Sequence, residues 1–199
     1  MDYNIRIPNA IVGKKMRDWT KEEAQFFYEW YLAEIPARIE ELRRIYELTG
    51  GGSKEDLDLS QGSLIPLWSW FMKNAEIVDR TPEEIEKIKV SQPEYTWQFI
   101  ATKKITNRWG VIGGFDIASY FASCFLKKYP DRLKWKLFRN GKSYTYYNKP
   151  VLVGFHRGKV PMDSMNLLKV NMGKLVDGNS KPEALFNLFS RWEEGIDQE

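Results

Sequence analysis

The chain has 199 residues, a formal net charge of +3, and shares of apolar (43%) and charged (29%) residues that argue against a disordered or fibrous protein. Its single histidine, His156, and single cysteine, Cys124, exclude a disulfide framework and a zinc site of the usual Cys/His type within one chain. A mechanism that uses histidine or a thiol would depend on one of these two residues. We therefore predict a protein that is not an enzyme, with no catalytic residues, no cofactor and no metal site.

The length suits one large domain, and no internal repeat or long linker divides the chain, so we predict a single domain over residues 1–199. The aromatic share of 15% is high, and most of the eight tryptophans must be buried in one core. The N-terminus has no secretory signal pattern, and no apolar stretch reaches the about 20 residues that span a bilayer. These features predict a cytoplasmic protein without membrane contact.

Helices are predicted to dominate residues 20–128. Thr20 and Glu23 form a capping-box pattern at the start of a long helix. Apolar residues then recur every three or four positions until Gly50, and Pro36 is expected to kink this helix or to split it in two. We interpret the apolar stripe as the face that packs on the core.

Further helices are predicted over residues 61–72 with Ser60 as cap, from Thr81 onward, over residues 95–105 and over residues 117–128. Residues 110–114 contain three glycines and are interpreted as a structural turn, because their spacing matches no phosphate-binding motif. Asp116 follows this turn and is the expected cap of the helix over residues 117–128.

The strand signals lie in residues 132–155. Residues 133–138 alternate with period two, and Asn140-Gly141 is typical of a tight hairpin turn, so residues 142–147 are predicted to return as the paired strand. Residues 150–155 are predicted as a third strand, and two helices over residues 162–193 complete the chain, the second capped by Ser180. The predicted fold class is α+β, mainly helical with a small antiparallel β-sheet.

Charge is unevenly distributed. Residues 1–100 carry a net charge of −5 and residues 101–199 carry +8, an asymmetry that can steer a charged partner. The acidic residues of the first half are ordinary for helix exteriors, but an acidic face is also what a protein presents to a basic partner. The residues we select as a partner-binding surface are Glu22, Glu29, Glu40, Asp56, Asp58 and Trp70.

The basic, aromatic segment 134–149 gives an alternative function, a nucleic-acid-binding module in which bases stack on aromatic rings. On a strand, however, Lys134 and Lys136 share one face while Trp135 faces the core, so an ordinary solvated face is the simpler interpretation. His156 is interpreted as a surface or hydrogen-bonding residue and Cys124 as a small buried apolar residue. The sequence identifies no small-molecule ligand.

Three segments resemble a family of small uncharacterised bacterial proteins that is similar to immunity proteins. They are residues 57–70 (LDLSQGSLIPLWSW), residues 117–135 and residues 150–155. The family pattern is D-x-S-x-x-S-L before an aromatic helix, then Y-x-G-E on a helix that leads to a strand tryptophan. Ala122 and Ser123 stand where the family has Gly-Glu, so no role of that glutamate transfers to this chain.

The resemblance implies a protein-binding protein that is not an enzyme, namely an immunity protein that occludes a secreted bacterial toxin. Its mechanism would be steric and electrostatic. The nucleic-acid-binding module remains the alternative. An enzyme that uses carboxylate or Ser/Lys chemistry without a recognisable motif is the third possibility.

Overall fold

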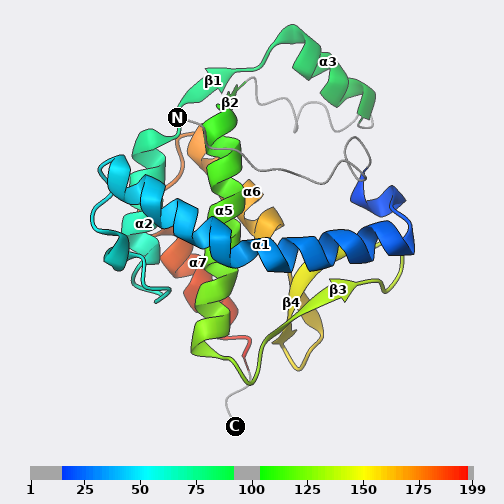
Figure 1. The fold of residues 1–199 in the computed structure, drawn as a ribbon. Helices are drawn as coiled ribbons and strands as arrows, with labels where there is room; N and C mark the ends of the chain where they lie inside the picture. The colour runs from blue at the N-terminus through cyan, green and yellow to red at the C-terminus, as the bar shows by residue number, and fades with distance from the viewer. Residues whose placement is uncertain (1–14, 92–103, 197–199) are drawn as a thin grey trace.

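The computed structural model describes residues 15–91 and 104–196, which form the predicted α+β fold, mainly helical with two small antiparallel sheets (Figure 1). The helices are α1 (Lys21–Leu48), α2 (Leu64–Asn74), α3 (Pro82–Ser91), α5 (Arg108–Lys128), α6 (Ser164–Val176) and α7 (Ala184–Glu193). The strands are β1 (Ile77–Asp79), β2 (Lys104–Thr106), β3 (Lys134–Phe138), β4 (Lys149–Phe155) and β5 (Val160–Met162). Two short 3-10 turns, η2 (Met16–Asp18) and η3 (Lys54–Asp56), flank α1.

Helix α1 lies across α5 near the middle of the molecule (Figure 1). The predicted capping box starts it: Thr20 N donates to Glu23 Oε2 at 2.9 Å, and Glu23 N donates to Thr20 Oγ1 at 3.2 Å. Of the two outcomes expected at Pro36, the split is wrong, because α1 is one helix of 28 residues, and the kink stays a prediction. Pro36 is exposed, so its ring stands on the side away from the core.

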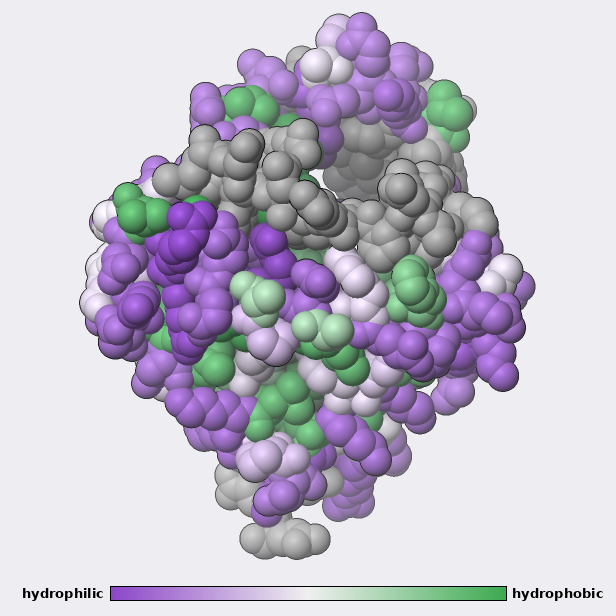
Figure 2. Space-filling model, viewed as in Figure 1, coloured by the Kyte–Doolittle hydropathy of each residue, from purple (hydrophilic) through white to green (hydrophobic). Residues whose placement is uncertain are grey.

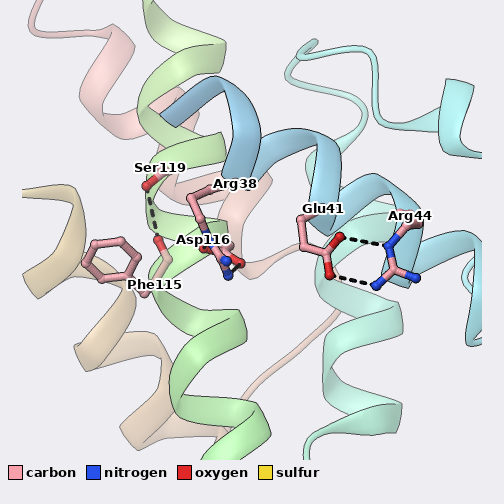
Figure 3. A network of polar contacts seen from close by, with 6 residues as sticks. All are labelled: Arg38, Glu41, Arg44, Phe115, Asp116 and Ser119. Carbon is pink, nitrogen blue, oxygen red and sulfur yellow. Dashed lines mark hydrogen bonds and ion pairs between the residues drawn. The ribbon is translucent and has the colours of Figure 1, made fainter. Parts of the chain in front are cut away.

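A buried ion pair joins α1 to α5 where they cross. Asp116 is 0% exposed, and Arg38 donates from Nε to Oδ1 at 2.8 Å and from Nη2 to Oδ2 at 2.5 Å (Figure 3). The prediction that Asp116 caps a helix is therefore wrong. Helix α5 begins eight residues earlier, where the Asn107 side chain accepts from Gly110 N at 2.9 Å. An unpaired carboxylate could not occupy this position without a large desolvation cost.

The glycines of residues 110–114 lie inside α5, so the predicted turn is wrong. Their function is close packing. A Cβ on Gly110 would lie 2.6 Å from Cβ of Thr106, and one on Gly114 would overlap Sδ of Met172. The missing side chains thus let β2 and α6 approach the helix axis, which offsets the low helix propensity of glycine.

The main sheet has the order β3-β4-β5, and both pairs are antiparallel. The prediction that residues 142–147 form the strand paired with β3 is wrong, because β3 pairs with β4 in a register that places Trp135 opposite Leu152. Residues 140–148 form successive turns instead. They end at Asn148, whose side-chain amide donates to the Met16 carbonyl at 2.8 Å and so ties the loop to the start of the chain.

The second sheet, β1 with β2, had no strand signal that we recognised. Most of the helix predicted over residues 95–105 lies outside the described residues, and its described end belongs to β2. The helix from Thr81 is confirmed as α3. The two C-terminal helices are confirmed as α6 and α7, although Ser180 is no cap: its hydroxyl accepts from Trp68 Nε1 at 2.9 Å.

The buried residues of α1, α2, α5, β4, α6 and α7 form one hydrophobic cluster. At its centre the rings of Phe125 and Phe189 stack with centroids 3.8 Å apart, and Phe121 and Phe155 meet Phe125 edge-on. Aromatic burial therefore joins the helical part of the chain to the sheet.

We expect the free energy of unfolding of the Asp116→Asn variant to be about 3–5 kcal/mol lower than that of the wild type, because it removes the negative charge that faces the buried Arg38 guanidinium. The double variant Arg38→Met/Asp116→Val should lose less than this single variant, because it removes both charges. Urea unfolding followed by circular dichroism measures each value. A loss below about 1 kcal/mol for Asp116→Asn would contradict the structural role of the pair.

We expect Gly110→Ala to destabilise the protein by about 1–3 kcal/mol, because the added methyl meets Thr106. Gly173→Ala in α6 is the matched control. No neighbouring atom lies within 4 Å of its Cβ position, so alanine there should stabilise by about 0.5–1 kcal/mol. Thermal unfolding of both variants gives the comparison, and equal signs for the two would count against the packing role.

Candidate functional site

Five of the six residues selected for partner binding are exposed, and one is in the core. Trp70 is 3% exposed, its Nε1 donates to Thr49 Oγ1 at 2.8 Å, and its ring packs against Tyr46 with centroids 5.4 Å apart. It fixes the C-terminal end of α1 against α2. Trp70 is therefore not part of a partner surface.

The selected glutamates of α1, Glu22, Glu29 and Glu40, lie on one side of the helix. Their spacings are seven and eleven residues, and Glu47 follows seven residues later. At 3.6 residues per turn these four positions fall within about 20° of one another, opposite the buried stripe. We call these four residues the acidic stripe; it extends about 37 Å along the helix at a rise of about 1.5 Å per residue.

Each carboxylate of the acidic stripe has a different local environment. Hydrogen bonding from its own backbone N–H, and then from the Thr20 hydroxyl, holds the pKa of Glu22 below its usual value. Glu29 accepts from Gln25 Nε2 at 2.7 Å, and Glu40 forms an ion pair with Arg43. Glu47 Oε1 accepts from Lys54 N at 3.4 Å, and within the described part of the chain Glu22, Glu29 and Glu47 form no ion pair.

Sequence reasoning missed Glu47, although the signal was present. Glu47 lies 25 residues after Glu22, which is close to seven complete turns of an α-helix. Projecting the whole predicted helix as one element would have placed it beside the other three. The expectation that Pro36 divides the helix obscured this alignment.

Asp56 and Asp58 follow α1 in the chain, and their carboxylates stabilise turns by accepting hydrogen bonds from backbone N–H groups. Asp56 Oδ2 accepts from Ser53 N at 3.0 Å, and Asp58 Oδ1 accepts from Ser60 N at 2.8 Å. Hydrogen bonding from the Ser60 hydroxyl, and then from its N–H, lowers the pKa of Asp58. Both side chains are exposed, but they organise the connection from α1 to α2 and lie off the acidic stripe.

The D-x-S-x-x-S-L segment, residues 58–64, has a structural role. The Tyr120 hydroxyl accepts from Leu59 N at 2.8 Å and lies 2.6 Å from the Ser63 hydroxyl, which also donates to the Ser60 carbonyl at 2.7 Å. Leu59 has a left-handed φ of 62°, so the turn needs such anchors. The segment therefore ties the start of α2 to the middle of α5.

The residues that could serve His or Cys chemistry have different environments. Cys124 is 1% exposed on α5, and burial raises the pKa of its thiol, which disfavours the reactive thiolate. His156 is exposed at the turn between β4 and β5, and its backbone N donates to the Gly195 carbonyl at 2.5 Å. Among residues 15–91 and 104–196, no group of three or more His, Cys, Asp and Glu side chains could hold a metal ion.

The basic face of the sheet also differs from a nucleic-acid platform. Lys134 and Lys136 are exposed on β3, but Trp135 between them packs edge-on against Tyr31 with centroids 5.5 Å apart. In the loop that follows β3, Tyr144 is 60% exposed. The described helices include none that is long and apolar enough to cross a membrane.

Comparison with known proteins adds no assignment: no family model, no curated protein and no solved structure matches this chain. The interpretation of the site therefore depends on the geometry of the described residues. The resemblance drawn from residues 57–70, 117–135 and 150–155 stays a prediction.

We expect Tyr120→Phe to lower the free energy of unfolding by about 1–3 kcal/mol, because Leu59 N and the Ser63 hydroxyl lose their buried partner. Tyr144→Phe is the control, since its hydroxyl belongs to an exposed side chain and its loss should change stability by less than about 0.5 kcal/mol. Chemical denaturation of both variants tests this, and indistinguishable midpoints would contradict the anchoring role.

Proposed function

We propose that this protein is a cytosolic binding protein, not an enzyme, that occludes a protein partner with the outer face of α1. In the particular form that we favour, the partner is a secreted bacterial toxin and this chain is its immunity protein. The observation that supports the proposal best is the acidic stripe, in which three residues selected from sequence align with Glu47 on one solvent-facing line.

The proposed mechanism is electrostatic attraction followed by steric blockage. Seven glutamates lie on α1, against Lys21, Arg43 and Arg44 as the basic residues outside the core. Arg38 is the remaining basic residue, and the buried Asp116 neutralises it. A basic cleft, such as one that binds nucleic-acid phosphates, would meet this surface with complementary charge.

A fixed helix suits this function because its carboxylates are already oriented. The outer face keeps its direction because the opposite face of α1 is packed in the core, and the ion pair with Asp116 locks its position on α5. Binding then orders only side chains, which reduces its entropic cost.

The alternative function is a nucleic-acid-binding module. Its support is the exposure of Lys134, Lys136 and Tyr144 in and beside β3. The inward position of Trp135 argues against it, because the lysines have no stacking ring between them. Salt separates the two functions: phosphate contacts would make the affinity for any nucleic acid fall steeply with salt, independently of sequence.

The test of the proposal is affinity purification from nuclease-treated lysate of the source organism, with three baits. The wild type should retain one stoichiometric protein, and Glu22→Lys/Glu29→Lys/Glu47→Lys should retain at least tenfold less of it, because each reversal places like charges together. Asp131→Lys is the control bait, since Asp131 is an exposed acidic residue off α1. Denaturant unfolding checks that every bait is folded; the triple variant is expected to be less stable than the wild type, because Glu22 lies in the first turn of α1, where a carboxylate is favoured over a cation.

If the recovered partner is a toxin, a growth test extends the same experiment. Expression of the recovered protein alone should arrest growth, and co-expression of wild-type chain, but not of the triple variant, should restore it. Loss of every bound protein on nuclease treatment would contradict the proposal. So would a partner that Lys134→Glu/Lys136→Glu releases and the triple variant retains.

A further inference from the structure

Helix α1 has a second apolar line, on its outer face. Phe26, Trp30, Ala33 and Ala37 follow one another at spacings of four, three and four residues, and none of them belongs to the buried stripe. Phe26 is 48% exposed and both alanines are exposed, whereas Trp30 is half-buried and packs in part against the core and the ring of Phe27. We call these four residues the outer seam. In Figure 2, green and pale green residues interrupt the purple surface along the front of the molecule, where α1 runs in Figure 1.

The 4-3-4 spacing is the one with which a helix packs along another helix, because it keeps apolar side chains on one side over successive turns. The exposed side of a helix normally carries long polar residues at these positions. Here the C-terminal half of the seam carries Ala33 and Ala37, with Pro36 beside them, so another helix could approach the α1 backbone closely.

Carboxylates border the outer seam on both sides. Glu22 and Glu29 of the acidic stripe lie along one edge, and Glu34 lies along the other, about 100° or more around the helix from them. Glu34, like Glu22 and Glu29, forms no ion pair with another described residue. In paired helices these bordering positions carry the charges that select the partner.

We infer that the outer seam is the docking site of a single α-helix of the partner, one with an apolar line bordered on both sides by lysine or arginine. This inference rests on the proposed function and specifies the partner's chemistry. The apolar line would fill the shallow C-terminal half of the seam at Ala33 and Ala37, and the cations would meet Glu29 and Glu34. A partner helix with acidic borders would be repelled.

The seam runs from Phe26 to Ala37, which is about 17 Å, or three helical turns. A helix of four or five turns would therefore cover it and reach the flanking carboxylates. Phe26, the largest exposed side chain of the seam, is the expected anchor, because aromatic residues dominate the energy of such contacts.

The first test uses synthetic peptides and the full-length folded chain. Peptide one has 21 residues, with leucine and alanine at heptad core positions and lysine at the bordering positions. Peptide two replaces the lysines with glutamate, and peptide three is peptide one in scrambled order. On addition of peptide one, the NMR chemical shifts of the backbone amides of Phe26, Ala33 and Ala37 should change. Peptides two and three should bind at least tenfold more weakly. Equal binding of peptides one and three would overturn the inference, because it would show charge attraction alone.

Three single variants locate the contact. Phe26→Gln and Ala33→Gln should each weaken the binding of peptide one by at least tenfold, the first by removing the anchor and the second by filling the shallow half of the seam. Val170→Gln on α6 is the matched control, since Val170 is 50% exposed and lies off α1. The inference would be overturned if the shift changes caused by peptide one disappeared in Val170→Gln and persisted unchanged in Phe26→Gln.

The purified partner separates the inference from the proposed function. If Phe26→Gln, Ala33→Gln and the charge reversal of the acidic stripe each release the partner, the result supports both the helix docking site and the proposed function. Release by reversal of the acidic stripe with full retention by Phe26→Gln and Ala33→Gln overturns the helix docking site and leaves the proposed function standing.

Discussion

The crossing of α1 over α5 is the constraint on which the rest of the structure depends. Arg38 reaches Asp116 in the interior with two hydrogen bonds, and this contact fixes both the position of α1 along α5 and its rotation about its own axis. A rotation of one residue, about 100°, would expose the buried stripe and separate the two charges. The pair therefore determines which residues of α1 face outward.

The fixed rotation of α1 also aligns its exposed residues. Because α1 remains one helix through Pro36, glutamates that lie 25 residues apart in sequence stand on one line, and the outer seam runs beside them. The same helix thus packs on the core with one side and, in the proposed function, presents the other side to the partner. The glutamates Glu22, Glu29 and Glu40 were selected from sequence on charge alone, and the structure aligns them with Glu47 through helical geometry that charge counts do not contain.

The sequence predicted those elements whose formation depends on residues close together in the chain. The capping box at Thr20 and the apolar period predicted α1, since both depend on neighbours within one or two turns. The errors arose where a distant contact decides the outcome. Residues 110–114 match a turn in sequence, but their glycines are packed against β2 and α6. Residues 142–147 match a strand, but β3 pairs with β4 instead. Trp70 lies off the apolar stripe of its helix in projection, but its Nε1 donates a hydrogen bond to Thr49 Oγ1 in the interior.

Carboxyl footprinting of the complex tests the central claim most directly. The partner recovered by affinity purification is bound to the wild-type chain, both states are labelled with a carbodiimide and an amine, and lysines are acetylated in parallel. The account predicts that Glu22, Glu29 and Glu47 become protected on binding while Lys134 and Lys136 react as before. Full labelling of those three glutamates in the complex, with protection confined to the two lysines, would contradict it.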